Sequence, residues 1–324
     1  MLKNTPKPAS LSHRMRPLVT NPSRQPRART SMTSPFTFSR HSIAKFTRPD
    51  QNEDRVLSLP RSGLGAVFDG VGGEDGYIGS LVASQTIRAH WKKVLSTHPR
   101  VSSEALFPCS AIDLRATLDQ IIMEAHERLC AESVRRTKDD GSPLRPCTTI
   151  ALVALCQDPD STACKLICAH VGDSRIYLRH ANGTFERVTD DDGFFSLLVA
   201  RQMLTPEDAR RIDQASEPSQ LSHLERSYFD RRNGITQALG DRVDPSVHIT
   251  EVPFESGDRV LLCTDGVHDN LTDEEIAEVL GEKARTSVAR KMVLRALDVS
   301  RQETQGILRS KQDDISALVI SRNY

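Results

Sequence analysis

Two long apolar runs in this chain each end on an aspartate followed by a glycine. They are GAVFDGVGG at 65–73 and RVLLCTDGVHD at 259–269. Each run is typical of a buried strand that carries a carboxylate to its exposed end. Two further acidic clusters, QNEDR at 51–55 and KQDDISALVI at 311–320, lie beside strand-like runs in the same way. The pattern predicts that several strand ends bring carboxylates together.

The spacing of apolar residues also predicts the other elements. Helices are expected where apolar residues recur at helical spacing or an N-cap is present, at 77–95, 114–129, 205–212, 273–280 and 286–301. Thr205 is the expected N-cap of the third, and Thr272 and Glu275 form the expected capping box of the fourth. Strands are expected at 56–59, 65–69, 147–156, 165–173, 175–180, 184–189, 248–252, 259–264 and 315–321. A hairpin turn is expected at Arg61 to Gly63, between the first two strands. The four strands from 147 to 189 are expected to form one meander. This order of strands and helix pairs predicts an α+β domain whose helices cover a central pair of sheets.

Converging carboxylates need a compensating charge. Two carboxylates about 4 Å apart repel each other by roughly 4 kcal/mol at an effective dielectric constant near 20. Four of them must be protonated, be kept apart or bind a cation. A set of oxygen ligands suits Mg²⁺ or Mn²⁺. A turn would explain a single Asp-Gly pair, but two long runs with the same ending and two further acidic pairs favour a metal site.

Composition bounds the class of protein. The chain has 324 residues, of which 38% are hydrophobic, and this is enough to build a core. Since neither a long apolar span nor a secretory leader is found, we expect a cytoplasmic globular protein without a membrane span. The seven cysteines form no C-x-x-C pair, and we expect them to be small core residues in a reducing compartment.

The charge is unevenly distributed along the chain. Residues 1–49 contain ten Lys or Arg and no Asp or Glu, whereas the remainder contains 33 basic and 43 acidic residues. Because the beginning is also rich in proline and serine, residues 1–39 are predicted to be a disordered tail. A transit peptide and a nucleic-acid-binding arm are the alternatives, although no nucleic-acid partner is expected.

Two stretches fit C-x5-R, the minimal loop of cysteine-dependent phosphatases. They begin at Cys109 and Cys130 and end at Arg115 and Arg136. That chemistry needs free backbone amides and a lowered thiol pKa. Cys130 falls in a helical pattern with Glu132 inside the supposed loop, so the sequence argues against this alternative.

Eight motifs together resemble the metal-dependent protein phosphatases, the type 2C serine/threonine phosphatases, in their bacterial form. In the order of the family they are NED (52–54), VFDGVGG (67–73), TTIALVAL (148–155), HVGDSR (170–175), VTDDD (188–192), ITQALGD (235–241), CTDGVHDNLTDEEI (263–276) and QDDIS (312–316). The resemblance implies a phosphatase domain at 40–324 with a flap subdomain at about 190–233. The implied fold is a four-layer α/β/β/α sandwich of two mainly antiparallel sheets flanked by helix pairs.

The resemblance implies a site for two Mn²⁺ or Mg²⁺ ions. Asp69 matches the carboxylate that bridges both ions. Glu53 and the carbonyl of Gly70 match the ligands of one ion, and Asp265 and Asp313 match the ligands of the other.

Further residues match supporting positions of the family. Asp54 is expected beside the ligands, and Asp173 and Asp269 match positions that hold a weaker third ion. Arg48 is expected to clamp the substrate phosphate, although it lies one residue further from the metal ligand than the family arginine does. Val71 stands where many eukaryotic members have a histidine that protonates the leaving group, so the proton must come from another source.

The implied reaction is hydrolysis of phosphoserine or phosphothreonine on proteins. A water activated by the two ions would attack the phosphorus without a covalent phosphoenzyme. Phosphorylated proteins are then the partners, and a serine/threonine kinase is the expected counterpart in signal transduction. The alternative is a catalytically weak pseudophosphatase that binds phosphoproteins. The presence of all the principal metal carboxylates favours the enzyme.

Overall fold

The structure, a computed structural model, describes most of the chain from Ser34 onward. The described residues are 34–72, 74–97, 107–108, 114–135, 137, 141–157, 163–282, 287–302 and 308–323. They belong to one compact unit, Ser34–Tyr324. Residues 1–33 of the predicted tail lie outside the described residues. Within the described ranges, no helix is both long and apolar enough to cross a membrane.

Two antiparallel sheets form the centre of the fold. In the first, which we call the β13 sheet, the strand order is β1-β13-β12-β9-β10. In the second, the β7 sheet, the order is β11-β8-β7-β3-β2, and the short β5 pairs with β7 in parallel. The strands are β1 (Phe36–Ile43), β2 (Arg55–Leu59), β3 (Leu64–Phe68), β5 (Phe107–Pro108), β7 (Ile150–Gln157), β8 (Cys164–Val171), β9 (Arg175–Arg179), β10 (Phe185–Arg187), β11 (His248–Pro253), β12 (Arg259–Cys263) and β13 (Ile315–Arg322).

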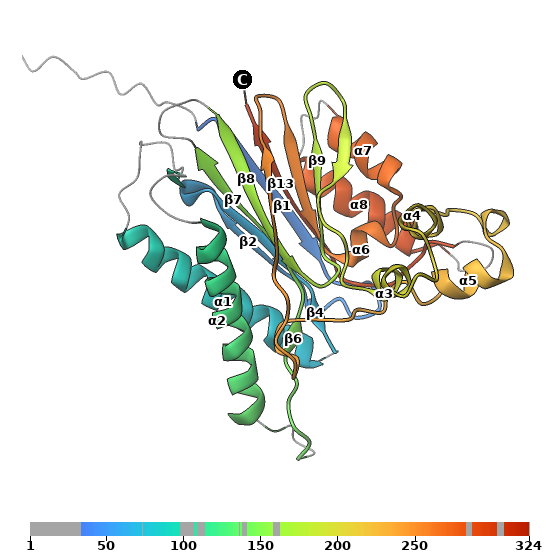
Figure 1. Cartoon of the computed structure of the whole chain (residues 1–324), viewed down its shortest axis with the longest axis horizontal. Coiled ribbons are helices and arrows are strands. Elements are labelled where there is room, and N and C mark those ends of the chain that lie inside the picture. Colours follow the sequence, from blue (N-terminus) through green and yellow to red (C-terminus); the bar gives the residue numbers. More distant parts are fainter. Residues whose placement is uncertain are drawn as a thin grey trace, which may run out of the picture. The chain divides into compact units, whose positions relative to one another are not determined.

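Helix pairs cover the outer faces of both sheets (Figure 1). Helices α1 and α2 pack on the β7 sheet through Trp91 and Leu118, and α7 and α8 pack on the β13 sheet through Ile276 and Met292. The helices are α1 (Glu74–Thr97), α2 (Leu114–Arg135), α7 (Asp273–Gly281) and α8 (Val288–Ser300). The predicted four-layer α/β/β/α sandwich is confirmed.

The apolar runs are continuous because their strands are buried on both faces. In β7, Ile150 and Leu152 face the α1 and α2 layer, whereas Ala151 and Val153 face the other sheet. A strand between two such layers cannot alternate apolar and polar residues. The carboxylates of the motifs lie just beyond the ends of such strands, with Asp69 after β3 and Asp265 after β12.

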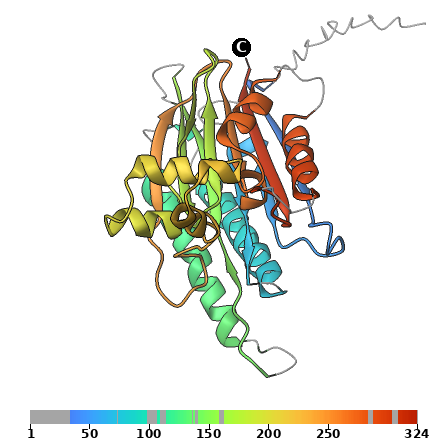
Figure 2. The same cartoon turned by 90° about the vertical axis from the view of Figure 1, so that its right-hand side faces the viewer.

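The segment between β10 and β11 contains three helices that lie together, outside the two sheets (Figure 2). They are α3 (Phe194–Ala200), α4 (Pro206–Asp213) and α5 (His223–Phe229). The predicted cap of α4 is confirmed, since the hydroxyl of Thr205 accepts the N–H of Asp208 at 3.1 Å. Helix α5 was not predicted, although its capping box of Ser222 and Glu225 is visible in the sequence.

Two sequence predictions about strands are wrong. The first strand is β1 at Phe36, before the expected first strand, and it pairs along its whole length with β13 at the other end of the chain. The expected meander does not form, because β8 belongs to the β7 sheet whereas β9 belongs to the β13 sheet. The chain crosses between the sheets at Gly172, whose φ of +96° favours glycine.

Candidate metal centre

The β2–β3 hairpin and the short strand β4 (Gly70–Val71) place Asp69 at the end of the β7 sheet. The backbone of Asp69 is held on both sides by Thr149, whose N–H donates to its carbonyl at 2.9 Å and whose hydroxyl accepts its N–H at 3.3 Å. Strand β4 pairs with β6 (Cys147–Thr148). Gly70 has no room for a side chain, because a Cβ there would lie 2.4 Å from the carbonyl oxygen of Gly76. The segment of Asp69 and Gly70 is therefore held in place by close backbone packing.

Asp314 attaches the segment of Glu53 to the start of β13. Its carboxylate accepts the N–H of Glu53 at 2.6 Å and the N–H of Lys45 at 2.8 Å. The hydroxyl of Ser80 on α1 donates to the carbonyl of Glu53 at 2.5 Å. Asp314 is thus occupied with backbone groups, which leaves the neighbouring Asp313 to face the cavity described below.

Asp265 follows β12 as the first residue of the short helix α6 (Asp265–His268). The preceding Thr264 donates its hydroxyl to the buried carboxylate of Asp54 at 2.8 Å and accepts the N–H of Ser316 at 3.1 Å. Asp54 therefore supports the strand end that carries Asp265 and is not among the residues that line the metal cavity.

Five of the seven predicted carboxylate residues meet in one cavity of about 270 Å³, which we call the metal cavity. Its lining includes five carboxylate residues and one predicted carbonyl ligand, namely Glu53, Asp69, Asp173, Asp265, Asp313 and Gly70. They come from five separate segments of the chain. Val71 also lines this cavity.

The proximity of these carboxylates changes their acidity. Burial, followed by the charges of Asp265 and Asp54, raises the pKa of Asp69 well above its ordinary value. Burial and Asp265 have the same effect on the pKa of Asp173. Burial raises the pKa of Asp265 to about 6, even though a lysine opposes this shift. The cavity thus contains more negative charge than its surroundings compensate.

That lysine is Lys311, which the sequence analysis missed. Its ammonium group contacts Asp265 and lies 3.0 Å from Asp269 Oδ2 and 3.1 Å from Asp313 Oδ2. These three carboxylates raise the pKa of Lys311 well above its ordinary value despite its burial. The signal in the sequence was its position two residues before Asp313.

Besides Asp54, two other predicted residues lie beside the metal cavity and not in its lining. Asp269 pairs with Lys311 and, at 3.4 Å, with Arg232, and these cations lower its pKa although burial by itself would raise it. The side chain of Arg48 is 44% exposed and lies 3.9 Å from Glu53 Oε1. The lining of the metal cavity includes Lys45 in place of Arg48, so Lys45 is a second candidate for binding phosphate.

Comparison with known proteins agrees with the motifs. The protein phosphatase 2C family matches residues 38–196, and the stage II sporulation protein E family matches residues 161–323. The serine/threonine protein phosphatase PstP of Mycobacterium tuberculosis is 30% identical over 230 residues, which are 71% of this chain and 36% of that protein. The chain therefore spans about a third of the length of PstP. The serine/threonine phosphatase stp of Listeria innocua is 25% identical over 79% of this chain and 83% of its own length.

Solved structures agree as well. The crystal structure of Mycobacterium tuberculosis PstP superposes with a TM-score of 0.64 at 25% identity, over 89% of this chain and 99% of the other. The PstP catalytic domain in complex with two manganese ions superposes with a TM-score of 0.61 at the same identity and coverage. The sandwich, the cavity and these matches together show that the chain belongs to the metal-dependent, type 2C protein phosphatase family.

Proposed function

We propose that this chain hydrolyses phosphoserine and phosphothreonine on proteins, with two Mn²⁺ or Mg²⁺ ions. The observation that carries the proposal is the meeting of five carboxylates from five segments in the metal cavity. The relatives named serine/threonine phosphatases support the choice of substrate class.

The residues of the metal cavity fit such ions. Asp265 Oδ1 is buried and has no hydrogen-bond partner, which is costly unless a cation binds there. All the donors are carboxylate or carbonyl oxygens, which suit Mg²⁺ and Mn²⁺. We assign Asp69, Glu53 and the Gly70 carbonyl to one ion, and Asp69, Asp265 and Asp313 to the other. When bound, such ions neutralise phosphoryl charge and lower the pKa of a water.

Residues of the chain itself would hold and orient the substrate. Lys45 lines the cavity, and Arg48 lies on the side of Glu53. We propose that the side chains of Lys45 and Arg48 both face the phosphoryl group of the substrate, with Lys45 nearer to it. Asp173 lines the cavity and Asp269 lies beside it, next to Lys311. We propose them as ligands of a weaker third ion that would have to displace the Lys311 ammonium.

The cysteine-dependent alternative finds no support in the described residues. Cys130 lies within α2, and burial followed by the charges of Asp244 and Asp241 raises its thiol pKa. A catalytic cysteine needs the opposite shift. Cys109 lies outside the described residues.

Cys147, Cys164, Cys168 and Cys263 are free thiols, like Cys130. Cys156 lies in the core as predicted, but it is disulfide-bonded, so the prediction of a reduced thiol is wrong for Cys156.

We further propose that the predicted phosphatase domain, 40–324, begins earlier, at Ser34, because β1 belongs to its sheet. We propose about 190–233 as its flap. A serine/threonine kinase that phosphorylates the same proteins, in a cytoplasmic signalling role, stays a prediction.

The test is hydrolysis of p-nitrophenyl phosphate and of phosphothreonine peptides by the purified chain. We expect activity with Mn²⁺ or Mg²⁺ and its loss in excess EDTA, with recovery when the metal is restored. Activity that persists in EDTA, or its loss in Cys130→Ser, would contradict the proposal. Binding of phosphoprotein without turnover at saturating metal would instead support the pseudophosphatase.

A further inference from the structure

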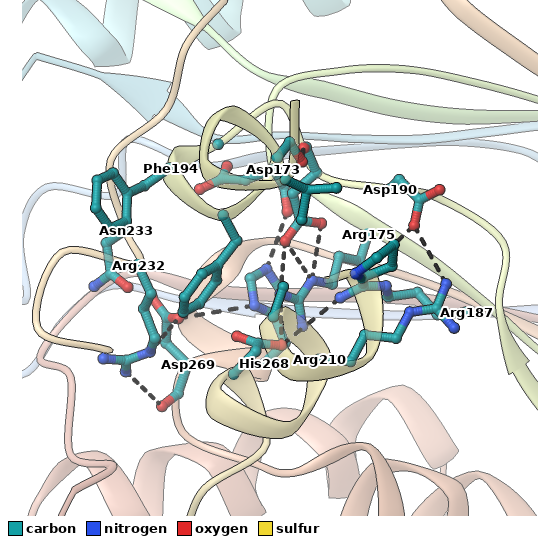
Figure 3. A pocket seen from close by; sticks show the side chains of 18 of the residues that line it. Asp173, Arg175, Arg187, Asp190, Phe194, Arg210, Arg232, Asn233, His268 and Asp269 are labelled. Carbon is teal, nitrogen blue, oxygen red and sulfur yellow. Dashed lines mark hydrogen bonds and ion pairs between the residues drawn. The ribbon is translucent and has the colours of Figure 1, made fainter. Parts of the chain in front are cut away.

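A second cavity, of about 330 Å³, lies beside the metal cavity and under α3 and α4. We call it the flap cavity. Asp173 and Asn233 line both cavities, so the two are adjacent. Figure 3 shows Arg232 and Asp269 on one side of the flap cavity and Arg175, Arg187 and Asp190 on the other.

One wall of the flap cavity is apolar. Helices α3 and α4 form this wall, through the side chains of Phe194, Phe195, Val199, Ala200, Pro206 and Ala209. The two phenylalanines and the valine are half-buried, and Ala200 and Pro206 are exposed. Apolar surface therefore remains open in a concave site, and such surface commonly marks a binding site.

The arginines of the flap cavity are already paired with aspartates. Each arginine in its lining pairs with an aspartate: Arg175 with Asp191 at 2.6 Å and Asp213 at 3.1 Å, Arg187 with Asp190 at 3.6 Å and Asp213 at 3.7 Å, Arg210 with Asp190 at 3.6 Å, and Arg232 with Asp269 at 3.4 Å. A bound anion would have to compete with these carboxylates. These ion pairs favour an uncharged occupant over a second phosphate.

The position of the cavity indicates which uncharged group would enter it. A phosphorylated residue at the metal cavity would place its neighbours in the peptide about 3.3 Å further along for each residue. Asn233 is exposed at the junction of the two cavities, where its amide can bond a peptide main chain. A volume of about 330 Å³ lies at the lower end of the range for ligand pockets, which suits one side chain better than a larger cofactor.

We propose that the flap cavity binds a large apolar side chain, such as Leu or Phe, within two residues of the phosphorylated residue. The chain would then prefer phosphorylation sites with an apolar neighbour. This inference rests on the proposed phosphatase activity, since it assumes that the phosphoryl group lies at the metal cavity.

The test uses phosphothreonine peptides that differ at one flanking position. Each carries Ala, Leu, Phe, Arg, Asp or phosphoserine there, and kcat/KM is measured with saturating Mn²⁺, with p-nitrophenyl phosphate as the substrate without flanks. We expect kcat/KM to be roughly tenfold higher for the best Leu or Phe peptide than for its Ala counterpart, because an apolar side chain leaves water.

Two variants examine the cavity. Ala200→Trp fills it from the end of α3, and Phe194→Ala removes part of its wall. We expect both variants to reduce the ratio of kcat/KM for the Leu peptide over the Ala peptide to within about twofold. If Ala200→Trp does not fold, Phe194→Ala still tests the proposal. Leu224→Trp is the matched control, because Leu224 is 61% exposed on α5 and is not in the lining of the flap cavity. This control should keep the preference.

The outcomes separate the two proposals. Absence of any apolar preference in the native chain, a preference for Asp or phosphoserine, or a preference that survives in both cavity variants would each overturn the flap-cavity proposal while the phosphatase stands. Failure to hydrolyse p-nitrophenyl phosphate with metal would overturn the phosphatase itself.

Discussion

The metal cavity and the flap cavity are adjacent, but the pKa of a buried aspartate shifts in opposite directions in the two. In the metal cavity, burial raises the pKa of Asp265 to about 6. In the flap cavity, burial acts on Asp213 in the same direction, but Arg175, Arg309 and Arg187 lower its pKa to about 2. Asp173 forms part of the wall of both.

The difference lies in compensation by neighbouring charges. Asp213 accepts hydrogen bonds from Arg175 and Gln214, so its charge is satisfied by the chain. Asp265 has one ammonium group near it and a buried oxygen without a partner. A buried carboxylate that no basic side chain neutralises can bind a cation. A buried carboxylate that is paired with an arginine instead has a structural role. The following predictions test this contrast, from the largest expected effect to the smallest.

Asp69→Asn should abolish phosphatase activity, because it removes the carboxylate proposed to bridge both ions. We expect kcat for p-nitrophenyl phosphate to fall by about a thousandfold or more. Calorimetry should also show weaker Mn²⁺ binding. The control is Asp298→Asn, an exposed position on α8, which should retain activity. Near-native activity in Asp69→Asn would remove the metal cavity from the mechanism.

Asp213→Asn should destabilise the fold, because it leaves the buried Arg175 without one of its two carboxylates. Loss of one partner of a buried ion pair costs about 3–5 kcal/mol, measurable as a lower free energy of unfolding in urea. On the same helix, Asp208 forms an exposed pair with Arg211. Asp208→Asn should cost less than about 1 kcal/mol. Equal costs would show that burial does not distinguish the two pairs.

Without metal, the stability of the protein should fall as the pH rises from about 4 to about 6. Asp265 has a pKa of about 6 when folded and an ordinary value of 3.8, so the folded chain holds the proton more tightly. The stabilisation by the proton on Asp265 is complete below pH 3.8 and is lost as the pH rises through about 6. The free energy of unfolding should fall by up to about 3 kcal/mol over this range.

This pH dependence is measured as Tm in EDTA across that range, with and without Mn²⁺. Mn²⁺ should restore stability at neutral pH, and Asp265→Asn should flatten the metal-free profile. A metal-free Tm that rises between pH 4 and 6 would contradict the raised pKa.

Lys311→Met should strengthen Mn²⁺ binding by about tenfold, or about 1.4 kcal/mol. The ammonium group of Lys311 forms ion pairs with the carboxylates of Asp265, Asp269 and Asp313. A metal ion that binds these carboxylates must therefore displace it. Titration calorimetry with Mn²⁺ measures the change. Lys291→Met removes a lysine from a partly exposed pair with Glu282 on the surface and should leave the affinity as it is. Unchanged or weaker binding in Lys311→Met would mean that Lys311 does not compete with the metal.

Local features were predictable because they depend on neighbouring residues. The capping box of Thr272 and Glu275 was predicted for α7 and is confirmed. The hairpin at Arg61 to Gly63 is confirmed by the antiparallel pairing of β2 and β3. The apolar runs predicted buried strands, because burial on both faces leaves no polar positions within them.

Long-range features were not predictable from the same patterns. Strand β1 is polar at several positions, and its pairing with β13 joins the two ends of the described chain. Consecutive strands usually pair, so β8 and β9 were expected in one meander, yet they belong to different sheets. The crossing at Gly172 is what carries Asp173 to both cavities.

The sequence by itself determined the fold class, the strand ends that carry carboxylates and the kind of ion they suit, because these follow from local spacing and ligand chemistry. The tertiary structure decided which charges are compensated. Lys311 meets three carboxylates, Lys45 lines the metal cavity and Arg175 holds Asp213. Such pairings depend on distances of a few ångströms between distant segments of the chain. Spacing along the sequence does not contain them.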